Sequence, residues 1–525
     1  GRVLNARVPF RPGEVIFEER PLHIVTEDSQ NEAFKLVRRL CRQDPDNFFQ
    51  EPLWYWAAVC SLTSEQVQPG PKKGSLPRVT ADQQRRLLCL YHEPVDEASE
   101  AVERLVRELR LNVSAVLLEE LLQAWILNCF DHSEAPQGYA AYFGSSFMSH
   151  SCQPNAIWHF AEGTSTPDTF VLVARRDIAS GDEVCISYVS ERVLLQSSSA
   201  RKKELQSSKK FICTCERCGP GAALPDQCRG FRCPHCGQGV VFHPGPLRGG
   251  LLSEGVCPAC GRAAGKLAEW LLEEESWLHQ QLNGLDESTE KKRISSVLTE
   301  KEVQLLLART GDGETGSVGL QHWLCDRLWG HLADWYDQTG RREDARRMMR
   351  RRVDYQRRAF QGLNGEPRRR SSGVSMNSRS SARNSRSGAG RPSPARGAHR
   401  GRQPAAPRQL GPAPIQEVRA GSSESSCLCV VVSFLAELAW TLESQADMLL
   451  RHLGVEPRGK RPPHLDEAAR GRAAAQALPL LEEATATLRQ MFGELHEYHR
   501  DVERKRARLS CHLSSAATAP PAPPA

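Results

Sequence analysis

The chain has no apolar run long enough to cross a bilayer as a helix. Its longest candidate, Cys427 to Ala436, spans ten residues, whereas a crossing needs roughly 20. No charged-then-apolar leader precedes Gly1, so we expect a protein that is not secreted and whose first residues are missing from the sequence. These absences favour a protein that neither spans a membrane nor is exported.

Outside a single segment, the chain has little excess of positive over negative charge. The formal net charge is +6 over 525 residues, and much of the excess lies between Arg368 and Arg402, in a run of Arg, Ser, Gly and Pro. Such a run can bind RNA or acidic surfaces without sequence preference. A solvated linker is the simpler interpretation, and we expect no nucleic-acid partner. Hydrophobic residues at 40% and charged residues at 25% are typical of a globular chain, here of roughly two to four domains.

Cysteine, in contrast, is abundant: there are 18, with eight between Cys213 and Cys260. Without a secretory signal, such clustering favours metal ligation over disulfides. Cys233-Pro-His-Cys236 and Cys257-Pro-Ala-Cys260 are two Cys-x-x-Cys knuckles, each followed by glycine. That glycine allows a turn that places both sulfurs on one side of a metal, and two knuckles supply the four thiolates of a tetrahedral zinc site. We therefore predict a zinc ribbon rather than free cysteines or disulfides.

A second cysteine group is one ligand short. Cys213-Thr-Cys-Glu-Arg-Cys218 offers three thiolates, and a closed site needs a fourth from elsewhere. Cys228 is nearest in sequence; Cys152 is the alternative, in the stretch Ser146 to Trp158 that also holds a histidine and an asparagine. By itself this stretch fits a Cys-His nucleophile pair, a metal site or a backbone bend, and spacing does not choose between the two cysteines.

The apolar pattern alternates between strands and helices. Leu4 to Val25 predicts two strands around a Pro-Gly turn, and strands return at 157–160, 170–174 and 183–188, after a helical stretch from about 31 to 129. Residues 267–360 are helical, and the pattern resumes from 430 to 509, so we expect the linker to interrupt one helical domain. The spacing of one tetratricopeptide helix pair is matched by Trp329, Leu332, Ala333, Tyr336, Gly340 and Ala345.

Three motifs follow one another: Ser149-His-Ser-Cys-Gln-Pro-Asn155, Gly181-Asp-Glu-Val-Cys-Ile-Ser-Tyr188 and Phe211-Ile-Cys-Thr-Cys-Glu-Arg-Cys218. They resemble the motifs of SET-domain protein-lysine methyltransferases, specifically the SMYD (SET and MYND) branch. Gly1-Arg-Val-Leu-Asn-Ala and Arg11-Pro-Gly-Glu-Val-Ile-Phe17 are similar to the first strands of that branch. The resemblance covers residues 1 to about 220, and a tetratricopeptide-like helical domain after the cysteines is similar to the branch too.

The resemblance implies an α+β fold with a β-rich SET core, in which one peptide runs beside the catalytic strand in a pseudoknot-like crossing. The expected parts are N-terminal SET strands (1–25), a helical insertion (26–111), the SET core (112–212), a post-SET zinc segment (213–220), a zinc ribbon (221–265), a helical tetratricopeptide-like region (266–363), a disordered linker (364–426), a C-terminal helical region (427–509) and a disordered tail (510–525).

The resemblance also implies roles for single residues in methyl transfer from S-adenosylmethionine to a protein lysine. Tyr188 is the expected catalytic tyrosine, and Phe130 a wall of the lysine channel. The expected cofactor contacts are Arg2, Asn128, Ser146, Ser149, His150 and Phe211, with Phe211 stacked on adenine. Cys152 is expected to join Cys213, Cys215 and Cys218 on one Zn²⁺, while the ribbon cysteines Cys233, Cys236, Cys257 and Cys260 hold a second.

Four departures from the branch matter. Ser149 replaces an asparagine, Val3 a glycine, and Lys209 an aromatic residue of the lysine channel, and no MYND zinc module follows the first strands. The alternative to an enzyme is therefore a catalytically weak SET scaffold that binds proteins through its helical repeats. For either protein we expect a monomer of the cytoplasm and nucleus without membrane contact, and with protein partners at the C-terminal helical domain.

Overall fold

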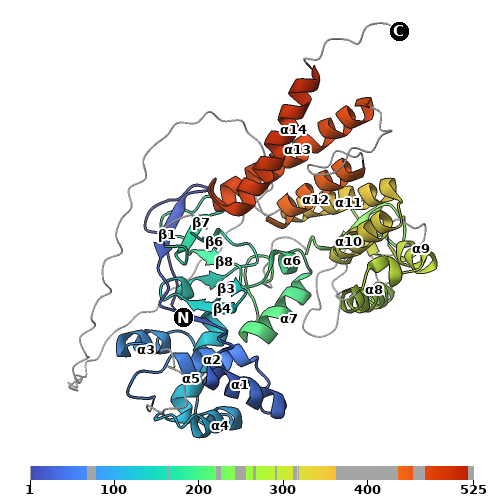
Figure 1. The fold of residues 1–525 in the computed structure, drawn as a ribbon. Coiled ribbons are helices and arrows are strands. Elements are labelled where there is room, and N and C mark those ends of the chain that lie inside the picture. The colour runs from blue at the N-terminus through green and yellow to red at the C-terminus, as the bar shows by residue number, and fades with distance from the viewer. Residues whose placement is uncertain are drawn as a thin grey trace, which may run out of the picture. The chain divides into compact units, whose positions relative to one another are not determined.

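The computed structural model describes residues 2–67, 78–161, 166–219, 226–242, 256–263, 268–289, 292–310, 316, 318–361, 436–452 and 467–517. These residues form a mixed helix-and-sheet structure (Figure 1), which confirms the predicted α+β class. The predicted linker, 364–426, lies outside the described residues.

Two small antiparallel sheets form the β-rich part of the N-terminal region. In the first, β7 (Phe170–Ala174) lies between β1 (Val15–Glu19) and β6 (Ala156–Phe160). In the second, β4 (Gln137–Ala141) lies between β2 (His23–Thr26) and β3 (Phe130–Glu134). All five residues of β7 are buried, as expected for a continuous apolar strand covered on both faces. The predicted strands at 157–160 and 170–174 are therefore present. Of the two strands predicted around the Pro-Gly turn, only the one after the turn forms, as β1; the segment before it makes only isolated bridges, at Asn5 and Phe10.

A helical insertion separates β2 from β3. It comprises α1 (Glu32–Gln43), α2 (Pro52–Cys60), α3 (Ala81–Leu88), α4 (Glu100–Glu108) and α5 (Ala115–Asn128). Four of these helices begin at a polar cap whose side chain accepts a backbone N–H, at Asn31, Thr80, Ser99 and Ser114. Because α5 packs against α2, α3 and α4, the insertion extends to Asn128, beyond the end predicted at residue 111.

Helices α6 (Glu191–Leu194) and α7 (Ser198–Lys209) lie between the second motif, which ends at Tyr188, and the third, which begins at Phe211. The predicted ribbon contributes β9 (Arg229–Arg232) and β10 (Val240–Phe242), and β9 also pairs with β11 (Val318–His322). This third strand, which the sequence pattern did not predict, joins the ribbon to the helical region.

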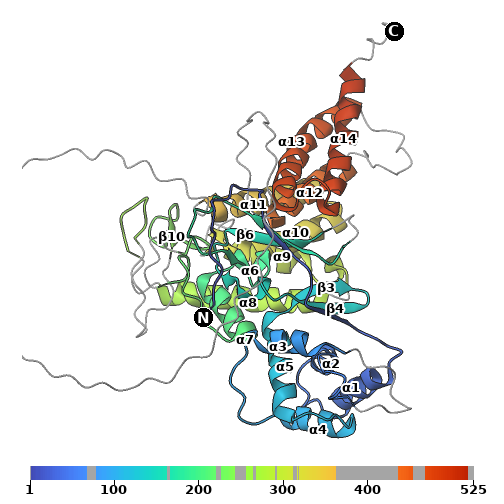
Figure 2. The same ribbon diagram turned by 90° about the vertical axis from the view of Figure 1, so that its left-hand side faces the viewer.

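The remaining helices pack together although the linker separates them in sequence. They are α8 (Ala268–Thr289), the short 3₁₀ turn η3 (Ile294–Ser296), α9 (Glu300–Arg309), α10 (Trp323–Gln338), α11 (Arg342–Gln361), α12 (Ala436–His452), α13 (Glu467–Phe492) and α14 (Glu497–Ala517). Helices α10 and α11 pack against each other, and Gly340 between them has a φ of +80°. Since α11 also packs against α12, and α12 to α14 lie side by side in both ribbon views (Figures 1 and 2), the linker interrupts one helical group. The last helix reaches Ala517, past the end predicted at 509.

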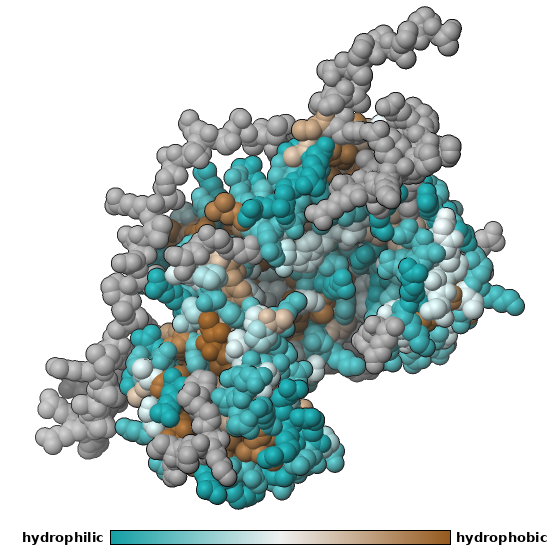
Figure 3. Space-filling view, viewed as in Figure 1, coloured by the Kyte–Doolittle hydropathy of each residue, from teal (hydrophilic) through white to brown (hydrophobic). Residues whose placement is uncertain are grey.

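The described surface is mainly hydrophilic on the face shown in Figure 3, where apolar residues form small, separate patches. Among the described residues, no helix is both long and apolar enough to span a membrane.

Candidate active site

The first and second SET-like motifs meet as two short parallel strands. Strand β5 (Ser149–His150) pairs with β8 (Cys185–Ile186), so Ser149 faces Cys185 and His150 faces Ile186. The pairing continues beyond the strands, because the Ser151 N–H donates to the Ile186 carbonyl at 3.0 Å. The two peptides expected to run beside each other in the crossing, β5 and β8, are therefore paired in parallel.

Asn155 extends this contact with its side chain. Its Nδ2 donates to the Glu183 carbonyl at 2.8 Å, and its Oδ1 accepts the Cys185 N–H at 2.7 Å. The amide thus replaces a backbone peptide in bonding to a strand. Asn155 directly follows Pro154, and no role was predicted for its side chain beyond the backbone bend that this stretch allows.

Three half-buried aromatic rings, one from each motif, gather at the end of the crossing. The centroid of Tyr188 lies 5.4 Å from that of His150 and 6.2 Å from that of Phe211, and the His150 and Phe211 centroids are 6.0 Å apart. The Tyr188 hydroxyl donates to the Met148 carbonyl. Residues separated by up to 63 positions in sequence (148 to 211) therefore form one cluster that includes the predicted catalytic tyrosine.

The protonation states of this cluster follow from burial. Burial raises the pKa of Tyr188 to about 12, and the nearby Cys185 and Glu183 act in the same direction, so Tyr188 is a neutral phenol near pH 7. Burial lowers the pKa of His150 to about 4. The neutral imidazole accepts the Tyr188 N–H at Nδ1 at 3.0 Å. Its proton is therefore on Nε2, which lies 3.3 Å from the Cys152 sulfur.

A second group of predicted cofactor residues lies around the segment that precedes β5. Ser146, in the 3₁₀ turn η1 (Ser145–Phe147), donates to the Tyr142 carbonyl at 2.5 Å and lies 3.3 Å from the Asn128 carbonyl oxygen. The guanidinium of Arg2 lies 5.2 Å from the centroid of Phe147. Arg2, Asn128 and Ser146 thus come together from three separate segments.

Phe130 lies in an aromatic cluster at the start of β3. Its ring centroid is 5.0 Å from that of Phe170 and 5.1 Å from that of Trp158. Tyr188 packs against the same apolar cluster. Phe130 therefore lies in the apolar surroundings of Tyr188, where a channel wall was predicted.

Lys209 has a structural contact that its sequence position did not suggest. Its Nζ lies 3.4 Å from each of the carbonyl oxygens of Ile126 and Leu127, in the last turn of α5. A cation at this position bonds the last, otherwise unpaired carbonyls of a helix. Lys209 thus joins the end of α7 to the end of α5, next to Asn128.

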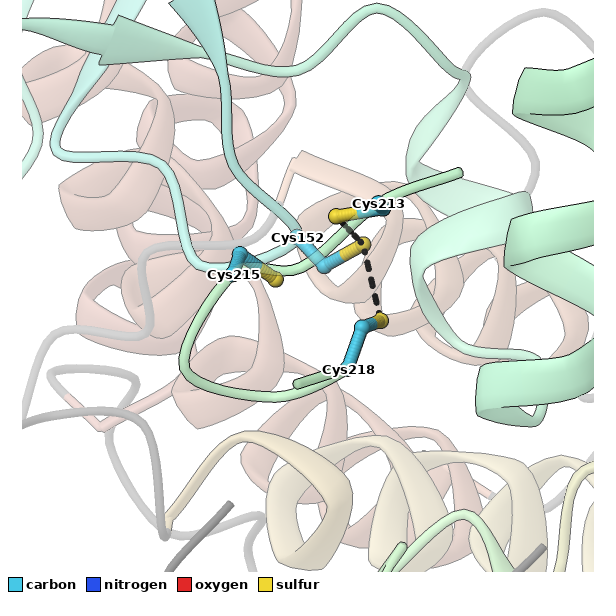
Figure 4. A group of neighbouring side chains, drawn as sticks. All are labelled: Cys152, Cys213, Cys215 and Cys218. Atoms are coloured by element: carbon cyan, nitrogen blue, oxygen red, sulfur yellow. Dashed lines mark hydrogen bonds between the residues drawn. The ribbon is translucent and has the colours of Figure 1, made fainter. Parts of the chain in front are cut away.

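Four sulfurs converge beside the crossing, from the segment after β5 and the segment after α7 (Figure 4). Those of Cys152, Cys213, Cys215 and Cys218 all lie within 4.8 Å of one another. Cys152 lies 3.9 Å from Cys213 and 3.5 Å from Cys218, sulfur to sulfur. Four ligands at a Zn–S distance of about 2.3 Å in a tetrahedron are about 3.8 Å apart, so the arrangement fits zinc. Cys228 is not part of this group. The fourth cysteine, which spacing alone did not identify, is therefore Cys152.

One buried arginine, Arg201, and one partly buried arginine, Arg217, lie beside this group. Arg201 is fully buried, with Nη2 3.4 Å from the Cys218 sulfur and Nη1 3.9 Å from an Asp226 oxygen. Arg217 donates to the Cys152 carbonyl at 2.7 Å. Four thiolates around one Zn²⁺ carry a net charge of −2, and a buried cation next to them offsets part of that charge. Neither arginine belongs to a motif that predicts this role.

The ribbon cysteines form a second group of four, Cys233, Cys236, Cys257 and Cys260. Two of the sulfur-to-sulfur distances are 3.7 and 3.8 Å, again the edge length of a zinc tetrahedron. The glycines after the two knuckles have positive φ, +64° at Gly237 and +69° at Gly261, and each donates its N–H to the carbonyl of the first cysteine of its knuckle. The predicted turn is therefore the reason why these sulfurs converge.

Comparison with known proteins agrees with this geometry. The SET domain family matches residues 1–189. "SET domain-containing protein SmydA-8, isoform B" of Drosophila melanogaster is 29% identical over 154 residues, 24% of this chain and 32% of the relative. "Protein-lysine N-trimethyltransferase SMYD5" of Gallus gallus is 36% identical over 103 residues, 19% of this chain and 21% of the relative. "Histone-lysine N-methyltransferase SMYD3" of Homo sapiens is 25% identical over 264 residues, 42% of this chain and 59% of the relative.

The chain thus contains a SET domain at residues 1–189, the class of domain that its strands and motifs define. Two of these relatives, SMYD5 and SMYD3, are named as lysine N-methyltransferases, and the identity to all three is low. The chain spans about a fifth to three fifths of the length of these three relatives.

Proposed function

We propose that this protein is an S-adenosylmethionine-dependent protein-lysine N-methyltransferase with two structural zinc ions. The observation that carries the proposal is the meeting of Tyr188, His150 and Phe211, one residue from each of three motifs, in a half-buried cluster. The SET domain match and the names of the relatives support the same reaction class.

The residues present suit the proposed cofactor. Phe211 offers an aromatic face for adenine, and Arg2 offers an exposed guanidinium for the carboxylate of the cofactor's amino-acid part. Asn128, Ser146, Ser149 and His150 complete the proposed contacts. When bound, S-adenosylmethionine would supply a methyl group on a positively charged sulfur. A lysine amine would bond the methyl carbon from the side opposite the sulfur, and the sulfur would leave.

Tyr188 would orient the substrate amine rather than remove its proton. A neutral phenol has one proton, and Tyr188 donates it to the Met148 carbonyl, so the hydroxyl oxygen keeps its lone pairs to accept an N–H from the amine. Since the phenol pKa is about 12, tyrosinate is scarce at neutral pH. Placing nitrogen, methyl and sulfur in line is then the main contribution of the site.

The substrate lysine must be neutral to react, although its reference pKa is about 10.4. Burial of the amine among apolar groups, next to a cationic sulfonium, lowers that pKa. Phe130 and Trp158, in the apolar cluster against which Tyr188 packs, are the residues that we assign to this environment. We further propose that the enzyme is monomeric, acts in the cytoplasm and nucleus, and binds partners at its helical domain.

Calorimetry with S-adenosylmethionine, followed by transfer of a tritiated methyl group to histones and lysate proteins, tests the proposal. We expect saturable binding and labelled protein. The second candidate is a weakly catalytic scaffold, favoured by Lys209, whose ammonium bonds α5 where the branch has a channel aromatic. Binding without transfer would support the scaffold, and absence of both would refute the enzyme and the cofactor contacts.

A further inference from the structure

Glu19, the last residue of β1, accepts three short hydrogen bonds from a segment 125 residues away in sequence. Its Oε1 accepts the Gly144 N–H at 2.7 Å, and its Oε2 accepts the Ser145 N–H at 2.7 Å and the Ser145 hydroxyl at 2.6 Å. The Glu19 backbone is fixed by pairing with Phe170 in β7. A single carboxylate therefore connects the first sheet to the start of η1.

The Glu19 carboxylate and the Gly144–Ser145 segment pack closely against each other. Ser145 is 1% exposed, so its hydroxyl and N–H have no access to water and need a protein acceptor. A Cβ added at Gly144 would lie 3.3 Å from the Glu19 Oε2, which is tighter than ordinary contact. The glycine thus leaves room for the carboxylate.

The segment that Glu19 bonds carries three groups of the candidate site. Ser146 is a proposed cofactor contact, Phe147 lies under the Arg2 guanidinium, and the Met148 carbonyl accepts the Tyr188 hydroxyl. The N–H groups of Gly144 and Ser145 lie at the N-terminal end of this 3₁₀ turn, where backbone donors have no intrahelical partner. An ionised acceptor there forms stronger bonds than a neutral one.

We propose that Glu19 is a positioning residue for S-adenosylmethionine binding: it fixes the Gly144–Met148 segment so that Ser146, Phe147 and the Met148 carbonyl are correctly placed. The proposal rests on the proposed function, since it names the cofactor. Glu19 itself bonds the protein backbone and Ser145, so it acts through the segment.

Glu19→Gln tests this inference with little change in size. The amide retains one acceptor, but its NH₂ group faces N–H donors, so at least one charge-assisted bond is lost. We expect the dissociation constant for S-adenosylmethionine to rise about tenfold, and the Michaelis constant for the cofactor to rise while that for the protein substrate stays unchanged. A purely structural role would lower the unfolding midpoint without this selectivity, so binding is measured well below that midpoint.

Glu18→Gln is the matched control. Glu18 is the preceding residue of β1 and is exposed, and consecutive strand side chains point to opposite faces. We expect it to bind the cofactor as the wild type does. Equal affinity of Glu19→Gln and wild type, or equal weakening by both substitutions, would overturn the proposal. If Glu19→Gln does not fold, Ser145→Ala removes one of the three bonds and should show a smaller effect with the same selectivity.

Amide hydrogen exchange separates this inference from the proposed function. In ligand-free protein, Glu19→Gln should speed exchange at Gly144 and Ser145, and Glu18→Gln should not. A wild type that fails to bind S-adenosylmethionine would refute the proposed function, and with it the role of Glu19 in cofactor binding. Unchanged exchange in Glu19→Gln would show that the carboxylate does not fix the segment, whether or not the cofactor binds.

Discussion

Replacing Tyr188 by phenylalanine separates the chemical step from cofactor binding. The ring stays, with its neighbours His150 and Phe211 at centroid distances of 5.4 and 6.2 Å, so we expect the affinity for S-adenosylmethionine to change little. The hydroxyl is lost, together with the oxygen that accepts from the amine. We expect methyl transfer to fall about 10²-fold, the scale of one lost transition-state hydrogen bond, or about 2.7 kcal/mol of activation free energy.

Tyr142→Phe is a matched control for this substitution. The Tyr142 hydroxyl also donates to a backbone carbonyl, that of Asp168, at 2.6 Å. Each change therefore removes one hydroxyl bound to a carbonyl, and each should lower the free energy of unfolding by about 0.5–1.5 kcal/mol. Only Tyr188→Phe should slow transfer, because only Tyr188 belongs to the cluster formed by the three motifs.

The assay combines initial rates with tritiated cofactor, calorimetric affinity and urea unfolding for both variants. Since the pKa of Tyr188 is about 12, its ionisation does not affect rates from pH 7 to 9. Any rise of rate with pH in that range reflects deprotonation of the substrate amine, and it should persist in Tyr188→Phe. Equal losses of rate and cofactor affinity, or an equal loss of rate in Tyr142→Phe, would refute a catalytic role for the Tyr188 hydroxyl.

Three further predictions concern the metal, the pocket and the end of α5. Metal analysis should find two zinc ions per chain. Cys152→Ser should lose one ion and weaken cofactor binding, whereas Cys228→Ser, at an equally buried cysteine, should keep both ions. Two ions in Cys152→Ser would contradict the ligand assignment. Ser149→Asn should restore one or two hydrogen bonds of about 0.5–1.5 kcal/mol each and bind S-adenosylmethionine roughly three- to tenfold more tightly in calorimetry; weaker binding by a stably folded variant would mean that the pocket has repacked around the serine. Lys209→Met should lower the free energy of urea unfolding by about 0.3–1 kcal/mol, and Lys203→Met, on the exposed side of α7, should change it less; equal effects would show that the bonds to α5 contribute nothing.

The local parts of the candidate site could be predicted because their cause is local. Each zinc knuckle needs two cysteines and a glycine at the turn, and Gly237 and Gly261 have the positive φ that this spacing requires. The assignment of Cys152 to the other group came from resemblance alone, since no local rule relates it to a segment some sixty residues later. Tertiary structure makes that choice by placing β5 beside β8.

Other features depend on contacts between distant segments, to which a sequence pattern is blind. The helical pattern ran unbroken past residue 111, and only the packing of α5 against α2 shows that this helix belongs to the insertion. Strand β11 is defined by its pairing with β9, almost a hundred residues earlier. Glu19 resembles any charged residue at the end of a strand until its partners Gly144 and Ser145 are seen.

One imidazole connects the proposed metal site to the proposed catalytic strand. The Nε2 of His150 lies 3.3 Å from the Cys152 sulfur, and its Nδ1 accepts the N–H of Tyr188 at 3.0 Å. A sulfur fixed by zinc would therefore fix the imidazole ring, which bonds the backbone that carries the phenol. At the other end of Tyr188, the hydroxyl is bound to the Met148 carbonyl, in the segment that Glu19 bonds. Tyr188 is thus held at its backbone through His150 and the cysteine group, and at its hydroxyl through the segment that Glu19 of β1 bonds. For this reason we expect a change at the zinc ligand Cys152 to affect the site.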